Sequence, residues 1–324
     1  MLLTIIRRLL QTVLVVLIMS ALVFAGLYLV GDPVAMLASP EATDAQREAL
    51  RRSLGLDLPL WHQYFIFISK AAHLDFGNSF LTGEPAMQLI LERMPATLEL
   101  ATLAIFASMA IGVPLGIYAG LKPRSISARS IMTGSVLGFS LPNFWVGLML
   151  IMLFAVILGW FPAGGRGPVR SFGPIELSVF NWQGLQNLIL PAATIAVAKC
   201  ALIIRVTRAA TRESLPQDYI KYARAKGLSN RRVLSVHLLK NILIPIVTIG
   251  GLEYGQVIAF AVVTETVFSW PGMGKLLIDS IITLDRPVVV AYLMLTVVFL
   301  ALLNLLVDIG YTVLDPRVRL GATA

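Results

Sequence analysis

Six long runs with few charges dominate the pattern of hydrophobic and polar positions along the chain. They cover residues 9–30, 100–121, 131–159, 187–204, 241–264 and 288–307. A helix of about 20 apolar residues crosses the ~30 Å hydrocarbon core of a bilayer and satisfies its backbone polar groups internally. The pattern therefore predicts an all-α integral membrane protein with six transmembrane helices.

The connections between these runs contain turn and capping signals. In the longest connection, 31–99, Thr43 and Gln46 fit a capping box and Gly55 fits a helix stop. These signals predict a short amphipathic helix over 44–53. The stretch 159–186 is rich in Gly and Pro, which predicts an irregular external loop. We find no internal repeat or separate soluble domain, so we expect one membrane domain over 1–324.

Composition agrees with lipid as the solvent. The chain is 57% hydrophobic and 14% charged, whereas soluble domains carry about 25% charged residues. The first run is longer than the apolar core of a signal peptide, so we expect it to be retained as a helix. The single Cys200 excludes an internal disulfide and a cysteine-built metal site.

The positions of the basic residues predict the orientation. Lys122, Arg124 and Arg129 lie in a connection without acids, and the segment 205–240 has nine basic residues but only two acidic ones. Cytoplasmic loops carry such an excess of Lys and Arg. We therefore expect a multi-pass protein of a bacterial-type inner membrane with both termini cytoplasmic and 31–99 external. The net charge of +8 is explained by these loops, so we expect no nucleic-acid partner.

Signals for catalysis are absent from the sequence. The dipeptide Gly274-Lys275 is followed by Leu276 and does not complete a phosphate-binding loop. The three histidines are scattered, and none pairs with a plausible nucleophile. We therefore expect no catalytic residue, no metal site and no cofactor in this chain, and we do not expect an enzyme.

Three polar residues within the runs are candidates for a translocation path: Asn143, Lys199 and Glu253. Charges inside a membrane are costly and mark functional sites by default. Glu253 lies among three glycines that permit close helix approach, so we expect a buried partner or a water-lined path for it. For Lys199 the alternative is a side chain that extends to the membrane surface. Asn143 follows Pro142, which is expected to kink its helix.

Small residues recur in the basic segment 205–240. Ala223, Ala225 and Gly227 lie among Lys and Arg residues, and small side chains let a short helix approach another protein closely. The alternative is a basic loop that only anchors the topology, and composition alone favours this alternative.

The segment Asp218-Tyr-Ile-Lys-Tyr-Ala-Arg-Ala-Lys-Gly-Leu228 resembles the cytoplasmic "EAA" loop of ABC importer permeases, and it is most similar to the dipeptide/oligopeptide branch. Six further segments resemble that branch: Leu74-Asp-Phe-Gly-Asn-Ser79, Pro95-Ala-Thr-Leu-Glu-Leu100, Ser140-Leu-Pro-Asn-Phe-Trp145, Glu265-Thr-Val-Phe-Ser-Trp-Pro-Gly-Met-Gly274, Asn304-Leu-Leu-Val-Asp308 and Asp315-Pro-Arg317. The resemblance runs from about residue 1 to 320.

The resemblance implies a type I importer permease whose loop forms a coupling helix seated on a separate ATPase. The residues it assigns to ATPase coupling are Asp218, Tyr219, Ala223, Arg224, Ala225, Lys226, Gly227 and Arg232. The sequence departs from the broad pattern at two places. The first three positions of the family's loop pattern read Lys221-Tyr-Ala223 in this chain. Lys240 occupies the position at which the pattern has a proline, and Pro245 follows five residues later. These departures affect the register of the docking contacts.

The resemblance also implies partners: a second homologous permease, two cytoplasmic ATPases that hold ATP and magnesium, an external solute-binding protein and membrane lipid. The implied solute is a di- or oligopeptide, with glutathione, nickel or a metal chelate as alternatives. An ion-driven transporter that uses Glu253 and Lys199 is a competing hypothesis. An intramembrane enzyme would require a nucleophile and a base at one depth, and we find no such pair.

Overall fold

The computed structural model describes residues 2–29, 34, 41–53, 55–173 and 175–314. The chain divides into two compact units. The larger unit comprises Met1–Ile5, Arg93–Ile278 and Leu302–Ala324, and the smaller unit comprises Ile6–Glu92 and Asp279–Ala301. The motif Asp315-Pro-Arg317 lies outside the described residues.

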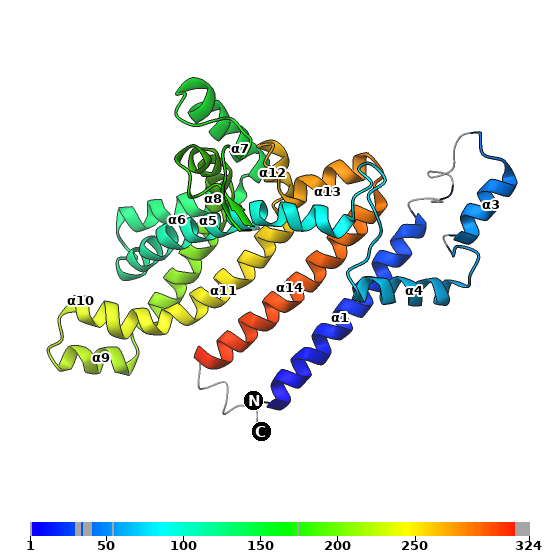
Figure 1. Cartoon of the computed structure of the whole chain (residues 1–324). Coiled ribbons are helices and arrows are strands. Elements are labelled where there is room, and N and C mark those ends of the chain that lie inside the picture. The colour runs from blue at the N-terminus through cyan, green and yellow to red at the C-terminus, as the bar shows by residue number, and fades with distance from the viewer. Residues whose placement is uncertain (1, 30–33, 35–40, 54, 174, 315–324) are drawn as a thin grey trace. The chain divides into compact units, whose positions relative to one another are not determined.

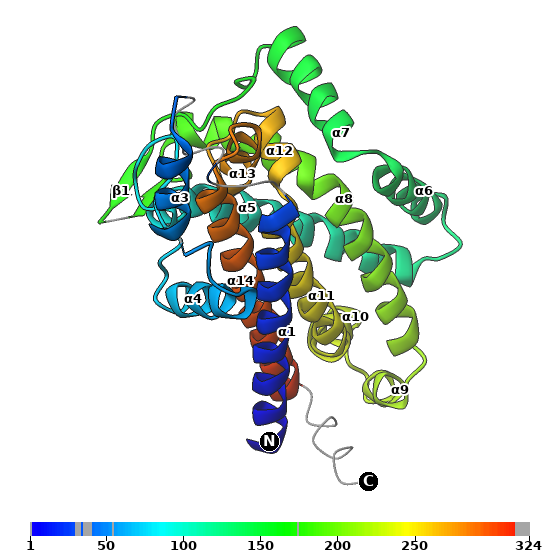
Figure 2. The ribbon, with the colours of Figure 1, turned by 90° about the vertical axis from the view of Figure 1, so that its right-hand side faces the viewer.

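Helices make up most of both units (Figures 1 and 2). The helices and strands are α1 (Leu2–Leu29), α3 (Asp44–Ser53), α4 (Leu60–Ala72), α5 (Ala86–Leu121), α6 (Ile126–Ser140), α7 (Asn143–Leu150), η1 (Ile151–Ile157), β1 (Arg170–Phe172), β2 (Ile175–Leu177), α8 (Trp182–Ser214), α9 (Asp218–Ala225), α10 (Asn230–Arg232), η2 (Val233–Leu238), α11 (Leu239–Phe260), α12 (Val262–Val267), α13 (Met273–Ile282) and α14 (Arg286–Leu314).

Among the described residues, five helical segments are long and apolar enough to cross a membrane. They are Leu9–Gly26, Ala86–Leu121, Trp182–Ser214, Asn230–Phe260 and Arg286–Val307. The pair formed by Ile126–Ser140 and Asn143–Ile157 passes the same test as a sixth, broken span. Each segment overlaps one of the six runs recognised in the sequence, and the predicted all-α membrane architecture is confirmed.

The third run, 131–159, is not one continuous helix. It breaks after Ser140, and the two helical parts are bent by 104°; Figure 2 shows the break between α6 and α7. Leu141 is extended, with φ −83° and ψ 133°, and Pro142 precedes the first turn of α7. A proline disfavours helical geometry in the residue before it and supplies no amide donor, so the expected kink is a complete break.

Several helices extend beyond their apolar runs. Helix α5 begins at Ala86 rather than at residue 100, so the predicted external segment 31–99 includes its first turns. Helix α8 continues to Ser214, so the segment predicted as a loop at 205–240 is largely helical. Hydropathy locates the part of a helix that suits hydrocarbon, whereas the helix itself continues wherever its turns remain packed or capped.

Helix α8 is the central element of the larger unit. It packs against α6, α7, α11 and α12. Gly112, Gly116 and Gly120 of α5 also face it, and a Cβ at Gly116 would lie 2.5 Å from Cβ of Thr207 and 2.8 Å from the carbonyl oxygen of Ile204. The absence of side chains at this spacing lets the two helices approach closely, as in other membrane helix pairs.

The stretch 159–186, predicted as an irregular loop, contains a short antiparallel hairpin. Strands β1 and β2 pair with Arg170 opposite Leu177 and Phe172 opposite Ile175. Helix α8 begins at Trp182 and takes up the last residues of the stretch. The remaining described residues are irregular, as the glycines and prolines indicate.

In the smaller unit, α3 confirms the helix predicted over 44–53. The Thr43 amide donates to Oε1 of Gln46 at 2.9 Å, and the Gln46 amide donates to Oγ1 of Thr43 at 3.4 Å. Gly55 has φ +69° and ends the helix. Helix α4 packs on α1 through Tyr64, whose ring lies 5.4 Å from that of Phe24.

Candidate functional site

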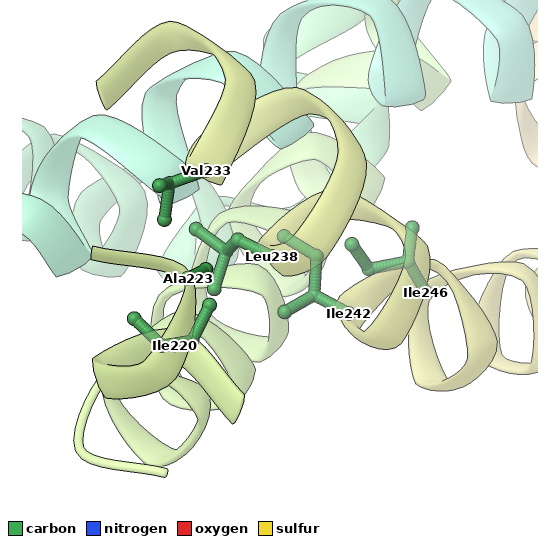
Figure 3. Close-up of a cluster of buried hydrophobic side chains, with 6 residues drawn as sticks. All are labelled: Ile220, Ala223, Val233, Leu238, Ile242 and Ile246. Atoms are coloured by element: carbon green, nitrogen blue, oxygen red, sulfur yellow. The ribbon is translucent and has the colours of Figure 1, made fainter. Parts of the chain in front are cut away.

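Helices α9 and α10, continued by η2, form a helical hairpin over residues 218–238, which we call the 218–238 hairpin. Figure 1 shows it beyond the ends of α8 and α11. One of its faces is buried within the larger unit, where Ile220 and Ala223 are 0% and 3% exposed. They form an apolar cluster with Val233, Leu238, Ile242 and Ile246 (Figure 3).

The apolar cluster connects the hairpin to the long helices. Ile242 and Ile246 belong to α11, and the partly buried Met109, Val113 and Ile117 of α5 pack against the same cluster. Burial of apolar surface is the main favourable term in such packing. Because close-packed interiors have low compressibility and transmit strain, the cluster is a packed connection from the hairpin to α5 and α11.

The turn between α9 and α10 is a Schellman motif. Gly227 has φ +74°, its amide donates to the carbonyl of Arg224 at 2.9 Å, and the amide of Leu228 donates to the carbonyl of Ala223 at 3.3 Å. The apolar contact that accompanies this motif is made by Leu228, which packs on the cluster. Ser229 then caps α10 by accepting an amide at 3.4 Å.

The other face of the hairpin is exposed and mainly basic. Lys221 donates from Nζ to Oδ1 of Asp218 at 2.9 Å, and this hydrogen bond lowers the pKa of the Asp218 carboxyl. Nζ of Lys226 lies 4.7 Å from the ring centroid of Tyr222, which is 63% exposed. The predicted coupling residues that are exposed are Asp218, Arg224, Ala225, Lys226, Gly227 and Arg232.

Ala223 and Gly227 are two of the predicted coupling residues. For both, the structure gives a reason for the small side chain other than docking. Ala223 faces the apolar cluster of its own chain, so its side chain packs inside the chain and not on the exposed face of the hairpin. A Cβ at Gly227 would meet nothing within 4 Å, so the positive φ requires the glycine there. Tyr219 is partly buried against the cluster. Ala225 is exposed and has no such internal reason among the contacts of the described residues.

Within the candidate spans, the structure brings Lys199 of α8 and Glu253 of α11 together. Nζ of Lys199 lies 2.5 Å from Oε2 of Glu253, and the side chains are 20% and 12% exposed. The expected partner of Glu253 is therefore Lys199. The Lys199 amine thus contacts a carboxylate on the neighbouring helix α11.

The glycines beside Glu253 admit side chains from two helices. A Cβ at Gly250 would lie 2.9 Å from Cε of Met109 on α5, and a Cβ at Gly251 would lie 2.6 Å from Cγ2 of Val307 on α14. The two glycines therefore make room for side chains of neighbouring helices. The contacting atoms belong to side chains rather than to backbones.

Asn143, the third candidate for a translocation path, begins α7 immediately after Pro142 and is exposed. Helix α7 packs on α8. The ion pair of Lys199 with Glu253 does not include Asn143.

Sequence reasoning missed a buried polar anchor at Glu265. Glu265 is 0% exposed, accepts the Thr97 hydroxyl at 2.7 Å and accepts the Lys275 amide at 2.9 Å. A Cβ at Gly272 would lie 2.3 Å from Oε1 of Glu265, and one at Gly274 would lie 3.0 Å from Oε2. The Pro-Gly-x-Gly turn thus leaves space for the carboxylate, and this pattern of glycines was the available signal.

Glu99 is a second anchor that the sequence did not identify. Its Oε2 lies 3.1 Å from the guanidinium of Arg166, and its other oxygen accepts the Val179 amide. Arg166 also donates to the carbonyl of Glu176 at 2.6 Å. Glu99 therefore attaches the stretch 159–186 to α5. No local sequence pattern predicts an interaction over this separation.

Among the described residues, no group of three or more His, Cys, Asp or Glu side chains is arranged to hold a metal ion. The arrangement contains a two-faced helical hairpin, an ion pair inside candidate spans and two polar anchors.

Two family models match the chain. The model described as "Binding-protein-dependent transport system inner membrane component" matches residues 112–320, and its N-terminal counterpart, "Binding-prot-dependent transport system membrane comp, N-term", matches residues 1–101. The chain belongs to this family of binding-protein-dependent transport permeases. It is therefore a multi-pass permease subunit of an ABC importer.

Curated relatives agree with the family over nearly the whole chain. A di/tripeptide transport system permease protein of Pseudomonas aeruginosa is 42% identical and covers 93% of this chain and 94% of its own. A dipeptide transport system permease protein of Escherichia coli is 38% identical with the same coverage. An oligopeptide transport system permease protein of Bacillus subtilis is 38% identical and covers 97% and 98%.

A solved structure shares the fold of this permease. The inward-facing methionine ABC transporter MetNI superposes with a TM-score of 0.54 at 19% identity, over 71% of this chain and 97% of that one. This likeness supports the importer permease fold that the motifs implied.

Proposed function

We propose that this permease forms half of the translocation pathway for di- and oligopeptides and is coupled to separate ATPase subunits through the 218–238 hairpin. The peptide substrate is supported by relatives whose names specify di/tripeptide, dipeptide and oligopeptide transport. Glutathione, nickel and metal chelates are the alternative solutes. An ion-driven carrier that acts alone does not suit a chain of a binding-protein-dependent family.

One observation supports the coupling role most directly: the hairpin has one buried face and one exposed face. Its inner face is fixed to α5 and α11 by the apolar cluster, and its outer face carries exposed Ala225 and Lys226. A bound ATPase would therefore move the long helices whenever it moved the hairpin. Closure of two ATPases would shift the pathway between inward-facing and outward-facing states.

The proposed assembly contains this chain, a second homologous permease, two cytoplasmic ATPases and an external solute-binding protein. ATP and magnesium are held by the ATPases, where hydrolysis takes place. Lys199, Glu253 and Asn143 are the proposed pathway residues. The family description, which names dependence on a binding protein, supports the external partner.

The proposed orientation places both termini and the hairpin in the cytoplasm of a bacterial-type cell, across its inner membrane. Cysteine probes test it in a Cys200→Ser background, with Ala49→Cys on α3 and Asn230→Cys on α10, both at exposed positions. A membrane-impermeant thiol reagent added to intact spheroplasts should modify Ala49→Cys alone. Modification of Asn230→Cys alone would reverse the orientation and remove the docking proposal.

Uptake assays test the solute. The complete complex is reconstituted in vesicles with its binding protein, and ATP-dependent accumulation is measured for a labelled dipeptide, a labelled pentapeptide, glutathione and a nickel chelate. We expect accumulation of the peptides. Accumulation of glutathione or nickel without either peptide would replace the peptide assignment with that alternative.

A further inference from the structure

A basic hollow lies where α5 and α8 end, separate from the buried face of the 218–238 hairpin. Its volume is about 760 Å³, and it is lined by Lys122, Pro123, Arg124, Ser125, Arg208 and Arg212. Four of these six residues are cationic, and no acidic side chain is among the lining residues. The hollow therefore concentrates positive charge on one small surface.

Close helix packing forces these like charges together. A Cβ at Gly120 would lie 2.6 Å from Cγ2 of Thr211 and 3.3 Å from the carbonyl oxygen of Arg208. This contact fixes the end of α5 beside the last turns of α8. Like charges gathered around one hollow repel each other, so the arrangement favours an anion that neutralises them.

Two further features suit an anion with several oxygen atoms. Nε of Arg208 is buried and has no hydrogen-bond partner within the described part of the chain. Ser125 caps the N-terminus of the 15-residue helix α6 and lines the hollow. The first amides of a helix lack intrahelical acceptors, and its positive dipole end attracts anions. Arginine matches phosphate with paired hydrogen bonds.

The position of the hollow along the membrane-spanning helices indicates the source of the phosphate. The apolar stretch of α8 ends at Ile204, before Arg205, Arg208 and Arg212, and α5 ends at Leu121. Cationic residues at the ends of membrane-spanning helices lie at the level of lipid headgroups, and basic pockets between such helices bind anionic lipids. We propose that this hollow binds the phosphate headgroup of an anionic phospholipid.

Native mass spectrometry of the purified full chain, with any subunits that accompany it, tests the proposal. Phosphatidylglycerol and phosphatidylcholine with identical acyl chains are the probes. We expect preferential binding of phosphatidylglycerol. The variant Lys122→Gln/Arg124→Gln, which changes two exposed residues, should weaken that binding by about tenfold or more and leave phosphatidylcholine binding unchanged. A second variant, Arg208→Gln, should act in the same direction.

The matched control is Arg47→Gln/Lys70→Gln, which removes two exposed charges from α3 and α4 and should retain the headgroup preference. Equal binding of the two lipids, or an equal loss in the control, would overturn the proposal. Displacement of phosphatidylglycerol by millimolar inorganic phosphate would identify a free-anion site instead. Loss of an associated protein subunit from Lys122→Gln/Arg124→Gln, with lipid binding unchanged, would identify a protein-docking surface instead.

Discussion

Lys199 of α8 and Glu253 of α11 form an ion pair between two helices that are each long and apolar enough to cross a membrane. The pair retains some exposure, with 20% of the lysine and 12% of the glutamate side chain accessible. Each charge therefore depends on the other for most of its stabilisation. This remaining exposure is compatible with the proposed role of the pair in the pathway.

The first prediction concerns this pair. Glu253→Gln removes one charge and leaves Lys199 without its counterion, so we expect a loss of about 2–3 kcal/mol in stability, below the range for fully buried pairs. Peptide uptake should fall while the complex still assembles. Thermal unfolding of the purified complex and vesicle uptake measure the two effects.

The double variant Lys199→Gln/Glu253→Gln should recover part of the lost stability, because neither charge then lies unpaired. The matched control is Glu48→Gln, which breaks the exposed pair of Glu48 with Arg52 on α3 and should cost less than about 0.5 kcal/mol. Equal stability of wild type, single variant and double variant would show that the pair contributes nothing.

The second prediction concerns the close contact of α5 with α8. Gly116→Ala places a Cβ 2.5 Å from Cβ of Thr207, so we expect a loss of about 1–3 kcal/mol from overpacking. Gly134→Ala on α6 is the control, since a Cβ there meets nothing within 4 Å, and it should be neutral or stabilising by up to about 1 kcal/mol. Denaturation midpoints that rank the two variants in the opposite order would contradict this packing.

The third prediction separates backbone conformation from docking at Gly227. Because its φ is +74°, Gly227→Ala should destabilise the hairpin by about 1 kcal/mol, whereas Gly227→Asn should be tolerated better. Both variants should retain bound ATPase subunits. Retention of wild-type stability in Gly227→Ala, measured by thermal unfolding, would contradict the conformational role.

Features determined by neighbouring residues were predictable from the sequence. The apolar runs, the capping box at Thr43 and the break at Pro142 depend on interactions within a few residues. The buried position of the Ala223 side chain was also predictable, because the apolar Ile220 lies three positions before it and the two share one face of the helix. The small-residue pattern was instead interpreted as a docking surface.

Long-range relationships were not predictable in the same way. Lys199 meets Glu253, and Thr97 meets Glu265, only because distant helices pack at particular rotations and depths. Lys199 and Glu253 lie inside apolar runs and so indicated that a partner was needed, but no local rule specified which one, and Glu265 was not identified at all. The hollow between the ends of α5 and α8 likewise requires the three-dimensional contact at Gly120.

The fourth prediction tests the central claim that the outer face of the 218–238 hairpin carries the ATPase contact. Ala225 is an exposed alanine of that face, whereas Ala223 is buried against its own chain. A tryptophan at 225 therefore obstructs a partner while leaving the apolar cluster intact. Ala45→Trp, at an exposed alanine of another short helix, α3, is the matched control.

The decisive measurement is ATPase co-purification together with peptide-stimulated ATP hydrolysis in reconstituted vesicles. Ala225→Trp should leave the stability of the isolated permease unchanged and should either release the ATPases or reduce peptide-stimulated hydrolysis by about tenfold, because overpacking a close contact costs about 1–3 kcal/mol. Ala45→Trp should retain both properties. Normal ATPase retention and normal coupled hydrolysis in Ala225→Trp would contradict the coupling role of the hairpin.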